Sequence, residues 1–309
     1  MRTKVDSDRF LRRLASAIAL GAAVVLIVAK LYGYLATDSV ALLTSAADAV
    51  VDALAATATF FGVRFAQHPA DSEHRFGHGK GEAVAAFAQA VLLASTAAVR
   101  AAQSLWRLVY PQHVTAITLG IWIAVGGLAI SSLLATMQTL VVRRTGSTAI
   151  AADRAHYLMD AVLNAAVLAA LALTSVTGWE RADPISALMI AGYMIAGARR
   201  VAQIASRQLL DHELPHEQRE RIKAAAVACL GIRGVHDLRT RDAGDRVFVE
   251  FHLEVDGHVS VLEGHRMVDA AERAVVGLFT KETEVIGHLE PTGIEDDRLD
   301  DRLRRPRSQ

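Results

Sequence analysis

Six long apolar stretches fill the first two thirds of the chain, whereas polar and apolar residues alternate over about the last hundred residues. A helix needs about 20 mostly apolar residues to cross the ~30 Å hydrocarbon core of a bilayer. The stretches that meet this length lie at residues 14–34, 40–61, 83–108, 115–142, 149–176 and 185–204. The pattern predicts a membrane α-helical bundle of six transmembrane helices, followed by a smaller polar domain.

The polar domain reads as two helices and three strands in the order αββαβ. A helical stretch starts after Pro215, and "VHDLRTRDAGDRVFVEFHLEV" alternates as a hairpin that turns at "DAGD". A second helical stretch, "VSVLEGHRMVDAAERAVVGLF", precedes a last strand, "TEVIGHLE". This order predicts an α+β domain of ferredoxin-like or metallochaperone-like type, with its helices on one face of a three-stranded sheet.

These patterns divide the chain into four predicted parts. A cytoplasmic N-terminal segment, 1–12, precedes the six-helix domain at 13–209, and a cytoplasmic metal-binding domain follows at 210–292. The final segment, 293–309, mixes charges and lacks apolar periodicity, so we expect a disordered tail.

The distribution of Lys and Arg orients the predicted spans. Basic residues lie before the first span and in the loops after the second and fourth spans, whereas the other loops carry almost none. Because cytoplasmic loops are enriched in Lys and Arg, both termini are expected in the cytoplasm. The inside-facing basic residues are Arg2, Lys4, Arg9, Arg12, Arg13, Arg64, Arg75, Lys80, Arg143 and Arg144.

Composition narrows the functional classes. The chain has 309 residues, 52% of them hydrophobic, and a formal net charge of zero, which gives no case for a nucleic-acid partner. Its single cysteine, Cys229, excludes an internal disulfide and a Cys-rich zinc module, and we expect it to be a small buried apolar residue. The long spans make a lipid bilayer the expected environment.

Ionisable residues occur in the middle of two predicted spans. Asp48 and Asp52 lie four residues apart in the second span, and His156 and Asp160 lie four apart in the fifth. Residues four apart share one face of a helix. Because one Asp at a bilayer centre costs about 2.5–3.5 kcal/mol on insertion scales, these residues need compensating partners. With the spans antiparallel, Asp52 falls level with His156, and Asp48 with Asp160.

Three carboxylates and one imidazole thus meet at one depth. A divalent cation would neutralise most of their negative charge, and Zn²⁺ accepts tetrahedral oxygen and nitrogen ligands. The alternative is that the acids are protonated and hydrogen-bond between helices, to Thr44, Ser45 or Asn164. The sequence alone gives no account of Arg100, which lies deep in the third span.

The loop after the second span, "QHPADSEHRFGHGKGE", holds a second candidate metal site. Asp71, His74 and His78 are spaced three and four residues apart, and neighbouring glycines let the loop turn tightly. The alternative is that these histidines are solvated and bind nothing. His68, just upstream, does not fit the spacing.

Further candidate ligands lie in the polar domain. His252 falls on the face opposite the apolar residues of "VFVEFHLEV", and His288 and Glu290 share one face of the last strand. His236 starts the hairpin and His265 lies on the second helix. Each histidine alone also fits a plain surface residue, so this pattern leaves both interpretations open.

The DxxxD and HxxxD spacings, the six spans and the polar tail domain resemble the cation diffusion facilitator family, most closely its bacterial zinc/iron efflux pumps. The resemblance runs from about residue 9 to residue 290. It implies that the quartet in the second and fifth spans is a transport site for a metal cation. His in the fifth-span motif implies zinc or cadmium, because many manganese members carry Asp there.

The same resemblance implies roles for the other clusters. "PADSEHRFGHGKGE" resembles the family's loop, whose Asp and two His bind a further metal ion. Lys80 and Asp211 match an ion pair near the family's dimer axis. The tail domain resembles one that holds a binuclear zinc site at the dimer interface, with Glu290 here where Asp is usual. The histidines that match this site are His236, His252, His265 and His288.

Together these features predict a homodimeric, proton-coupled exporter of Zn²⁺ in the bacterial inner membrane, a secondary active transporter rather than an enzyme. Metal ligands must be deprotonated, so Zn²⁺ and protons compete for one site. In an alternating-access cycle, proton entry would then drive the metal out. Cd²⁺, Fe²⁺ and Co²⁺ are alternative substrates.

Three other functions remain open from the sequence. A membrane-bound metal sensor would bind metal without transporting it. A proton-coupled carrier of another solute would use the acids only as proton relays, which leaves the histidine clusters unexplained. An intramembrane aspartyl protease would need its acids on separate helices, and no "GxGD" sequence occurs here.

Overall fold

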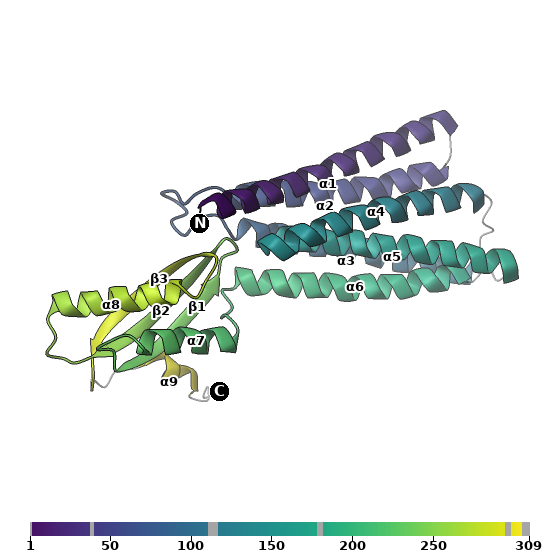
Figure 1. Cartoon of the computed structure of the whole chain (residues 1–309). Coiled ribbons are helices and arrows are strands. Elements are labelled where there is room, and N and C mark those ends of the chain that lie inside the picture. The colour runs from purple at the N-terminus through teal and green to yellow at the C-terminus, as the bar shows by residue number, and fades with distance from the viewer. Residues whose placement is uncertain (1, 38–39, 111–116, 178–181, 294–297, 305–309) are drawn as a thin grey trace. The chain divides into compact units, whose positions relative to one another are not determined.

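The computed structural model describes residues 2–37, 40–110, 117–177, 182–293 and 298–304. The chain forms two compact units, Met1–Ser206 and Arg207–Gln309. The first unit is helical and the second contains the sheet (Figure 1). The predicted division into four parts stays a prediction.

In its described residues, the first unit is made of six long helices (Figure 1). All except α5 are long and apolar enough to cross a membrane, by length and composition. The 30-residue α5 carries four ionisable residues between Asp153 and Asp160, so its crossing stays a prediction. The predicted helical membrane domain is confirmed, with five candidate spans in the described residues. The helices are α1 Arg2–Thr37, α2 Val40–Ala66, α3 Gly81–Val109, α4 Ile117–Thr145, α5 Thr148–Thr177 and α6 Ala182–Leu209.

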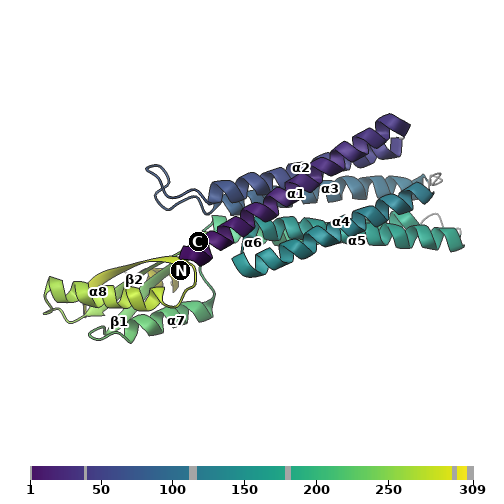
Figure 2. The ribbon, with the colours of Figure 1, turned by 45° about the horizontal axis from the view of Figure 1, so that its top comes forward.

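Helix α5 packs against its neighbours on two sides. On one side, Tyr157 packs with Ala19 of α1 and Leu134 of α4. On the other side, Met159 packs with Met194 of α6 and with part of α3. In lipid there is no hydrophobic driving force between helices, so their association depends on close packing. Small residues such as Ala19 allow the helices to approach closely enough for it. In Figure 2, α2 lies beside α3 and α4 beside α5, so residues of α5 can meet residues of several helices.

Two connections lie at one end of the helical unit, which we call the loop end. Residues 67–80 join α2 to α3, and residues 146–147 join α4 to α5. The first turns of α1 reach the same end, because Arg12 Nη1 donates to Glu82 Oε1 at 3.1 Å. Ser147 Oγ donates to the other oxygen of Glu82. These buried polar contacts join α1, α3 and the start of α5.

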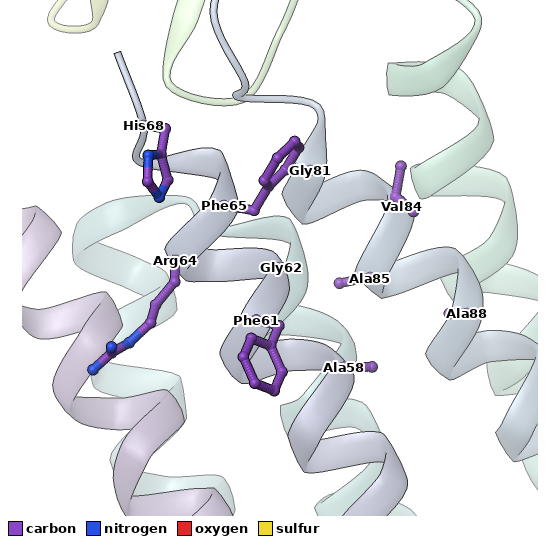
Figure 3. A pocket seen from close by; sticks show the side chains of 10 residues that line it. All are labelled: Ala58, Phe61, Gly62, Arg64, Phe65, His68, Gly81, Val84, Ala85 and Ala88. Atoms are coloured by element: carbon purple, nitrogen blue, oxygen red, sulfur yellow. The ribbon is translucent and has the colours of Figure 1, made fainter.

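Helices α2 and α3 meet at Gly62 and Ala85 (Figure 3). A Cβ added to Gly62 would lie 2.3 Å from the Ala85 Cβ, so the helices would have to move apart. We expect Gly62→Ala to lower the stability of the protein by about 1–3 kcal/mol, measured by thermal unfolding in detergent. The matched control is Gly21→Ala in α1, where the new Cβ meets nothing within 4 Å. Equal unfolding temperatures for the two variants would contradict this tight contact.

The second unit has a three-stranded sheet in the order β1-β2-β3. Strands β1 and β2 pair antiparallel, and β2 and β3 pair parallel through the crossover helix α8. The predicted αββαβ order is confirmed. The elements are α7 His216–Val227, β1 Gly234–Asp242, β2 Arg246–Val255, α8 Val261–Val276, β3 Glu282–Pro291 and α9 Leu299–Arg304.

The core of this unit lies between one face of the sheet and the helices α7 and α8. Ile222 of α7 and Val275 of α8 are fully buried against alternate residues of β2. Because side chains alternate across a strand, the other face of β2 presents the residues between them, including His252. The buried residues of β2 in this core are Val247, Val249, Phe251 and Leu253.

The segment 293–309, predicted as a disordered tail, contains a short helix in its described residues. Helix α9 begins at Leu299, whose N–H donates to Asp237 Oδ2 at 2.8 Å. Just before it, Arg298 Nη2 donates to Glu254 Oε1. These polar anchors fix the segment to the sheet, and an absence of apolar periodicity gives no sign of them. The disorder predicted for the tail as a whole stays a prediction, and the structure describes a short helix within it.

Candidate functional site

Helices α2 and α5 bring three of the four predicted transport ligands together. His156 Nε2 lies 3.0 Å from Asp52 Oδ1 and 3.3 Å from Asp160 Oδ2. The imidazole is buried, Asp52 is half-buried, and the three ligand atoms all lie within 4.8 Å of one another. His156 and Asp160 share a face of α5 because they are one helical turn apart. The donor set of two carboxylates and one imidazole suits a divalent cation such as Zn²⁺.

The fourth predicted ligand, Asp48, lies outside this group of three. Its Oδ2 is 3.3 Å from Arg100 Nη2 of α3, so the two residues form an ion pair. This contact accounts for Arg100, which the sequence left unexplained. A charge inside a membrane helix signals a partner of opposite sign, but the identity of the partner depends on the helix arrangement. The role of Asp48 as a ligand stays a prediction.

The structure also bears on the alternative in which the acids only hydrogen-bond between helices. The side chains of Thr44 and Ser45 lie outside the described residues. Asn164 Nδ2 donates to the backbone oxygen of Asp160 at 2.8 Å. That bond is local to α5 and involves neither carboxylate oxygen of Asp160, so it does not supply the interhelical partner that this alternative needs.

The loop cluster is arranged around Asp71. Its Oδ1 accepts the backbone N–H groups of Glu73 and His74, at 2.9 and 2.6 Å. The His74 N–H lowers the pKa of the Asp71 carboxyl, so this side chain is ionised at neutral pH. His74 Nδ1 and His78 Nε2 each lie 3.4 Å from one of its oxygens. The turn needs Gly77, whose φ of 81° favours glycine.

A backbone contact fixes the orientation of the His78 ring. Its Nδ1 lies 3.1 Å from the carbonyl oxygen of Pro69 and donates to it when it carries the hydrogen. Nε2, on the opposite side of the ring, then carries the lone pair that can bind a metal, and it faces Asp71. Metal-binding histidines usually donate their second nitrogen to such an acceptor. The three predicted loop ligands therefore fit a divalent cation, and metal binding there stays a prediction.

We expect Asp71→Asn to weaken metal binding at the loop while leaving the turn folded. The asparagine oxygen still accepts the N–H groups of Glu73 and His74, but the negative charge is lost. Zn²⁺ affinity of the loop should fall at least about 10-fold, measured by titration in an Asp52→Ala background. Glu73→Gln, the matched control, removes a charge from the same exposed turn. Equal affinities for both variants would exclude Asp71 as a ligand.

In the second unit, three strands bring His236, His252 and Glu290 together. The register pairs His236 with His252, and His252 with His288. Glu290 Oε1 lies 2.6 Å from His252 Nδ1, and Glu290 Oε2 lies 3.1 Å from His236 Nε2. These buried nitrogens face the carboxylate closely but do not have the geometry of a hydrogen bond to it. Two imidazoles and a carboxylate in this arrangement fit a metal ion.

The other two predicted ligands of this domain are both exposed. His288 borders the group, with Nε2 3.7 Å from Glu290 Oε1 and its ring centroid 4.8 Å from that of His252. His265 is also exposed and lies 3.9 Å from Asp269 on its own helix. Glu254 was not among the predicted ligands, yet its Oε1 is 3.3 Å from His236 Nδ1. Glu254 lies on the same face of β2 as His252, and this alternation could have identified it from the sequence.

Asp211, the predicted partner of Lys80, has a contact within its own unit. Its Oδ2 lies 3.9 Å from Arg241 Nη1, and its φ of 53° is unusual for a residue with a side chain. The predicted pair with Lys80 would join the two units and stays a prediction.

Comparisons with known proteins cover most of the chain. Residues 16–210 match the cation efflux transmembrane domain, and residues 214–292 match the cation efflux protein, cytoplasmic domain. The cation-efflux pump FieF of Yersinia enterocolitica is 38% identical over 91% of this chain and 94% of its own. FieF of Shewanella oneidensis is 38% identical over 95% of this chain and 98% of its own.

A solved structure of CzrB in its zinc form is 42% identical and covers 28% of this chain and 98% of its own, with a TM-score of 0.25. The family matches agree with the helical unit and the α+β unit. The chain therefore belongs to the cation diffusion facilitator family and is a metal cation efflux transporter rather than an enzyme.

Proposed function

We propose that this chain exports Zn²⁺ across the bacterial inner membrane in exchange for protons. The observation that carries the proposal is the position of His156 Nε2 between carboxylate oxygens of Asp52 and Asp160. One imidazole and two carboxylates suit Zn²⁺, and they hold protons when the metal is absent. Cd²⁺ fits the same ligands, and Fe²⁺ or Co²⁺ are weaker candidates.

Competition between metal and protons supplies the coupling. Facing the cytoplasm, the deprotonated site takes Zn²⁺. Facing the more acidic outside, the same residues take protons and release the metal. Alternating access between these two states makes each proton entry assist a metal exit. The match to the cytoplasmic domain of cation efflux proteins supports a homodimer, with both termini in the cytoplasm.

The direct test uses the full-length protein in lipid vesicles that contain a Zn²⁺ dye and a pH dye. The vesicle interior is set about one pH unit more acidic than the outside, and Zn²⁺ is added outside. We expect Zn²⁺ entry matched by proton exit. Zn²⁺ entry without proton exit would reject antiport, and binding without entry would favour a metal sensor. Competition by Cd²⁺ and Fe²⁺ in the same assay ranks the substrates.

A further inference from the structure

A second buried polar cluster lies one helical turn from the Asp–His–Asp group, toward the loop end. It comprises one residue from each of four helices, and each is at most 1% exposed. We call these residues the polar layer. Asp153 precedes His156 by three residues, so the polar layer and the transport site share α5. The members of the layer are Thr59 of α2, Gln89 of α3, Gln138 of α4 and Asp153 of α5.

Asp153 is the centre of the polar layer. Gln89 Nε2 donates to its Oδ1 at 2.7 Å, and Gln138 Nε2 donates to its Oδ2 at 2.5 Å. Thr59 Oγ1 donates to Gln89 Oε1 at 3.4 Å. One carboxylate therefore connects α5 to α3 and α4 directly, and to α2 through Gln89.

Such a layer is expensive to bury, and packing alone does not require it. Apolar residues of similar volume would fill the same space without desolvating a carboxyl and two amides. Gln138 Oε1 is buried and has no hydrogen-bond partner among the described residues. An incompletely satisfied polar network is less firmly held than a complete one. The polar layer is therefore suited to opening and closing.

The exposed fraction of the site side chains decreases from Asp48, which is farther from the loop end, to Asp153 in the polar layer. The side chains of Asp48 and Asp52 are 48% and 34% exposed, whereas that of His156 is 4% exposed. Asp153, one turn further toward the loop end, is 1% exposed. In the described residues, the transport site is thus more open on the side of Asp48 and closed on the side of Asp153.

We propose that the polar layer is the gate that closes the transport site toward the loop end, and that Asp153 is the positioning residue that holds it shut. While its hydrogen bonds hold, α5 is fixed against α3 and α4. When they part, the carboxylate and the amide oxygens line the way in, and oxygen contacts of this kind suit a hydrated divalent cation. This inference rests on the proposed function, because it assumes that a cation reaches the site from the loop end.

The test measures access to the transport site by chemical labelling. Cys229→Ser removes the single cysteine, and Asp52→Cys then places one thiol at the site. A membrane-impermeant maleimide is applied to membrane vesicles from either side. Ser72→Cys, at an exposed loop position, identifies the side on which the loop end lies. Labelling from the loop end should be slow while the polar layer is intact.

Two substitutions should open the gate. We expect Asp153→Leu and Gln138→Leu each to speed labelling from the loop end at least about 10-fold, because neither leucine can hold the hydrogen bonds of the layer. Gln67→Leu is the matched control, since Gln67 is also a buried glutamine but bonds instead to Arg13 and to the backbone of Arg9. If Asp153→Leu and Gln138→Leu label no faster than Gln67→Leu, the proposal is wrong.

Asp153→Asn separates hydrogen bonding from charge. The asparagine oxygen can accept from Gln89, and its amide can donate to the unpartnered Gln138 Oε1. This variant should therefore label within about 2-fold of the parent. Labelling as fast as in Asp153→Leu would show that charge, not hydrogen bonding, closes the site, and would overturn the gate.

The labelling result stands independently of transport, because Asp52→Cys already lacks a site ligand. Failure of the wild-type chain to exchange Zn²⁺ for protons would reject the proposed function, while the labelling rates would still decide the gate. With the site intact, Asp153→Leu should also let Zn²⁺ cross with less proton exchange per ion than Gln67→Leu. Unchanged coupling in Asp153→Leu would count against the gate.

Discussion

Replacing Asp52 with alanine is expected to abolish Zn²⁺ transport in the vesicle assay. Asp52 Oδ1 lies 3.0 Å from His156 Nε2, and it is the only member of the Asp–His–Asp group from α2. Without it, His156 and Asp160 are two ligands on one helix, and no ligand of the group remains on α2. We expect the affinity of this site for Zn²⁺ to fall at least about 100-fold.

The control for this prediction removes a carboxylate elsewhere in the same unit. Asp6, near the start of α1, is exposed and lies outside all three candidate metal groups of the described residues. Asp6→Ala should therefore transport as the wild type does. In a Zn²⁺ titration, Asp52→Ala should lose one class of site and keep those of the loop and the cytoplasmic domain. Wild-type flux in Asp52→Ala would remove Asp52 from the transport site.

Replacing Glu290 with alanine is expected to dismantle the metal group of the cytoplasmic domain. Its two carboxylate oxygens lie 2.6 Å from His252 Nδ1 and 3.1 Å from His236 Nε2, so one side chain connects two strands to a third. We expect the Zn²⁺ affinity of this domain to fall at least about 100-fold. Zn²⁺ at 100 times its dissociation constant should stabilise the wild-type domain by about 2.7 kcal/mol, and at the same Zn²⁺ concentration that gain should fall to about 0.4 kcal/mol or less in Glu290→Ala.

Two further variants locate the cause of this loss. Glu284→Ala removes an exposed carboxylate from the same strand and should keep the stabilisation by Zn²⁺. Glu290→Asp shortens the side chain by one methylene and keeps the charge, so it asks whether the reach of Glu is needed to contact both histidines. Zn²⁺ stabilisation in Glu290→Ala equal to that of Glu284→Ala would exclude Glu290 as a ligand.

The features that the sequence predicted well are those set by local periodicity. The αββαβ order and the sheet face of His252 follow from alternation, which the strand backbone enforces. The shared face of each i,i+4 pair follows from the helical repeat. Placing the two antiparallel spans across the same bilayer thickness puts the pairs of α2 and α5 at the same level. The structure brings Asp52, His156 and Asp160 together. Their role as metal ligands stays a prediction.

The features that the sequence missed depend on how the helices are rotated against one another. Nothing local to α3 tells that Arg100 faces Asp48 rather than lipid. Asp153 reads as one more charge near the start of a span, because its partners Gln89 and Gln138 come from two other helices. Helix rotation is set by the packing of small residues over many turns, which a single sequence does not reveal.

The ion pair between Asp48 and Arg100 has a consequence for turnover. For Asp48 to become the fourth ligand of the metal, its oxygen must first leave the guanidinium 3.3 Å away. The Arg100 guanidinium therefore competes with the metal ion for the Asp48 carboxylate. Because Arg100 is held in place by the fold, its effective concentration at Asp48 does not depend on the cellular metal level. If Asp48 serves as the fourth ligand, the return of Arg100 to it would weaken ion binding and hasten release. On that prediction, the pair would favour a carrier that releases its ion quickly over one that stores it.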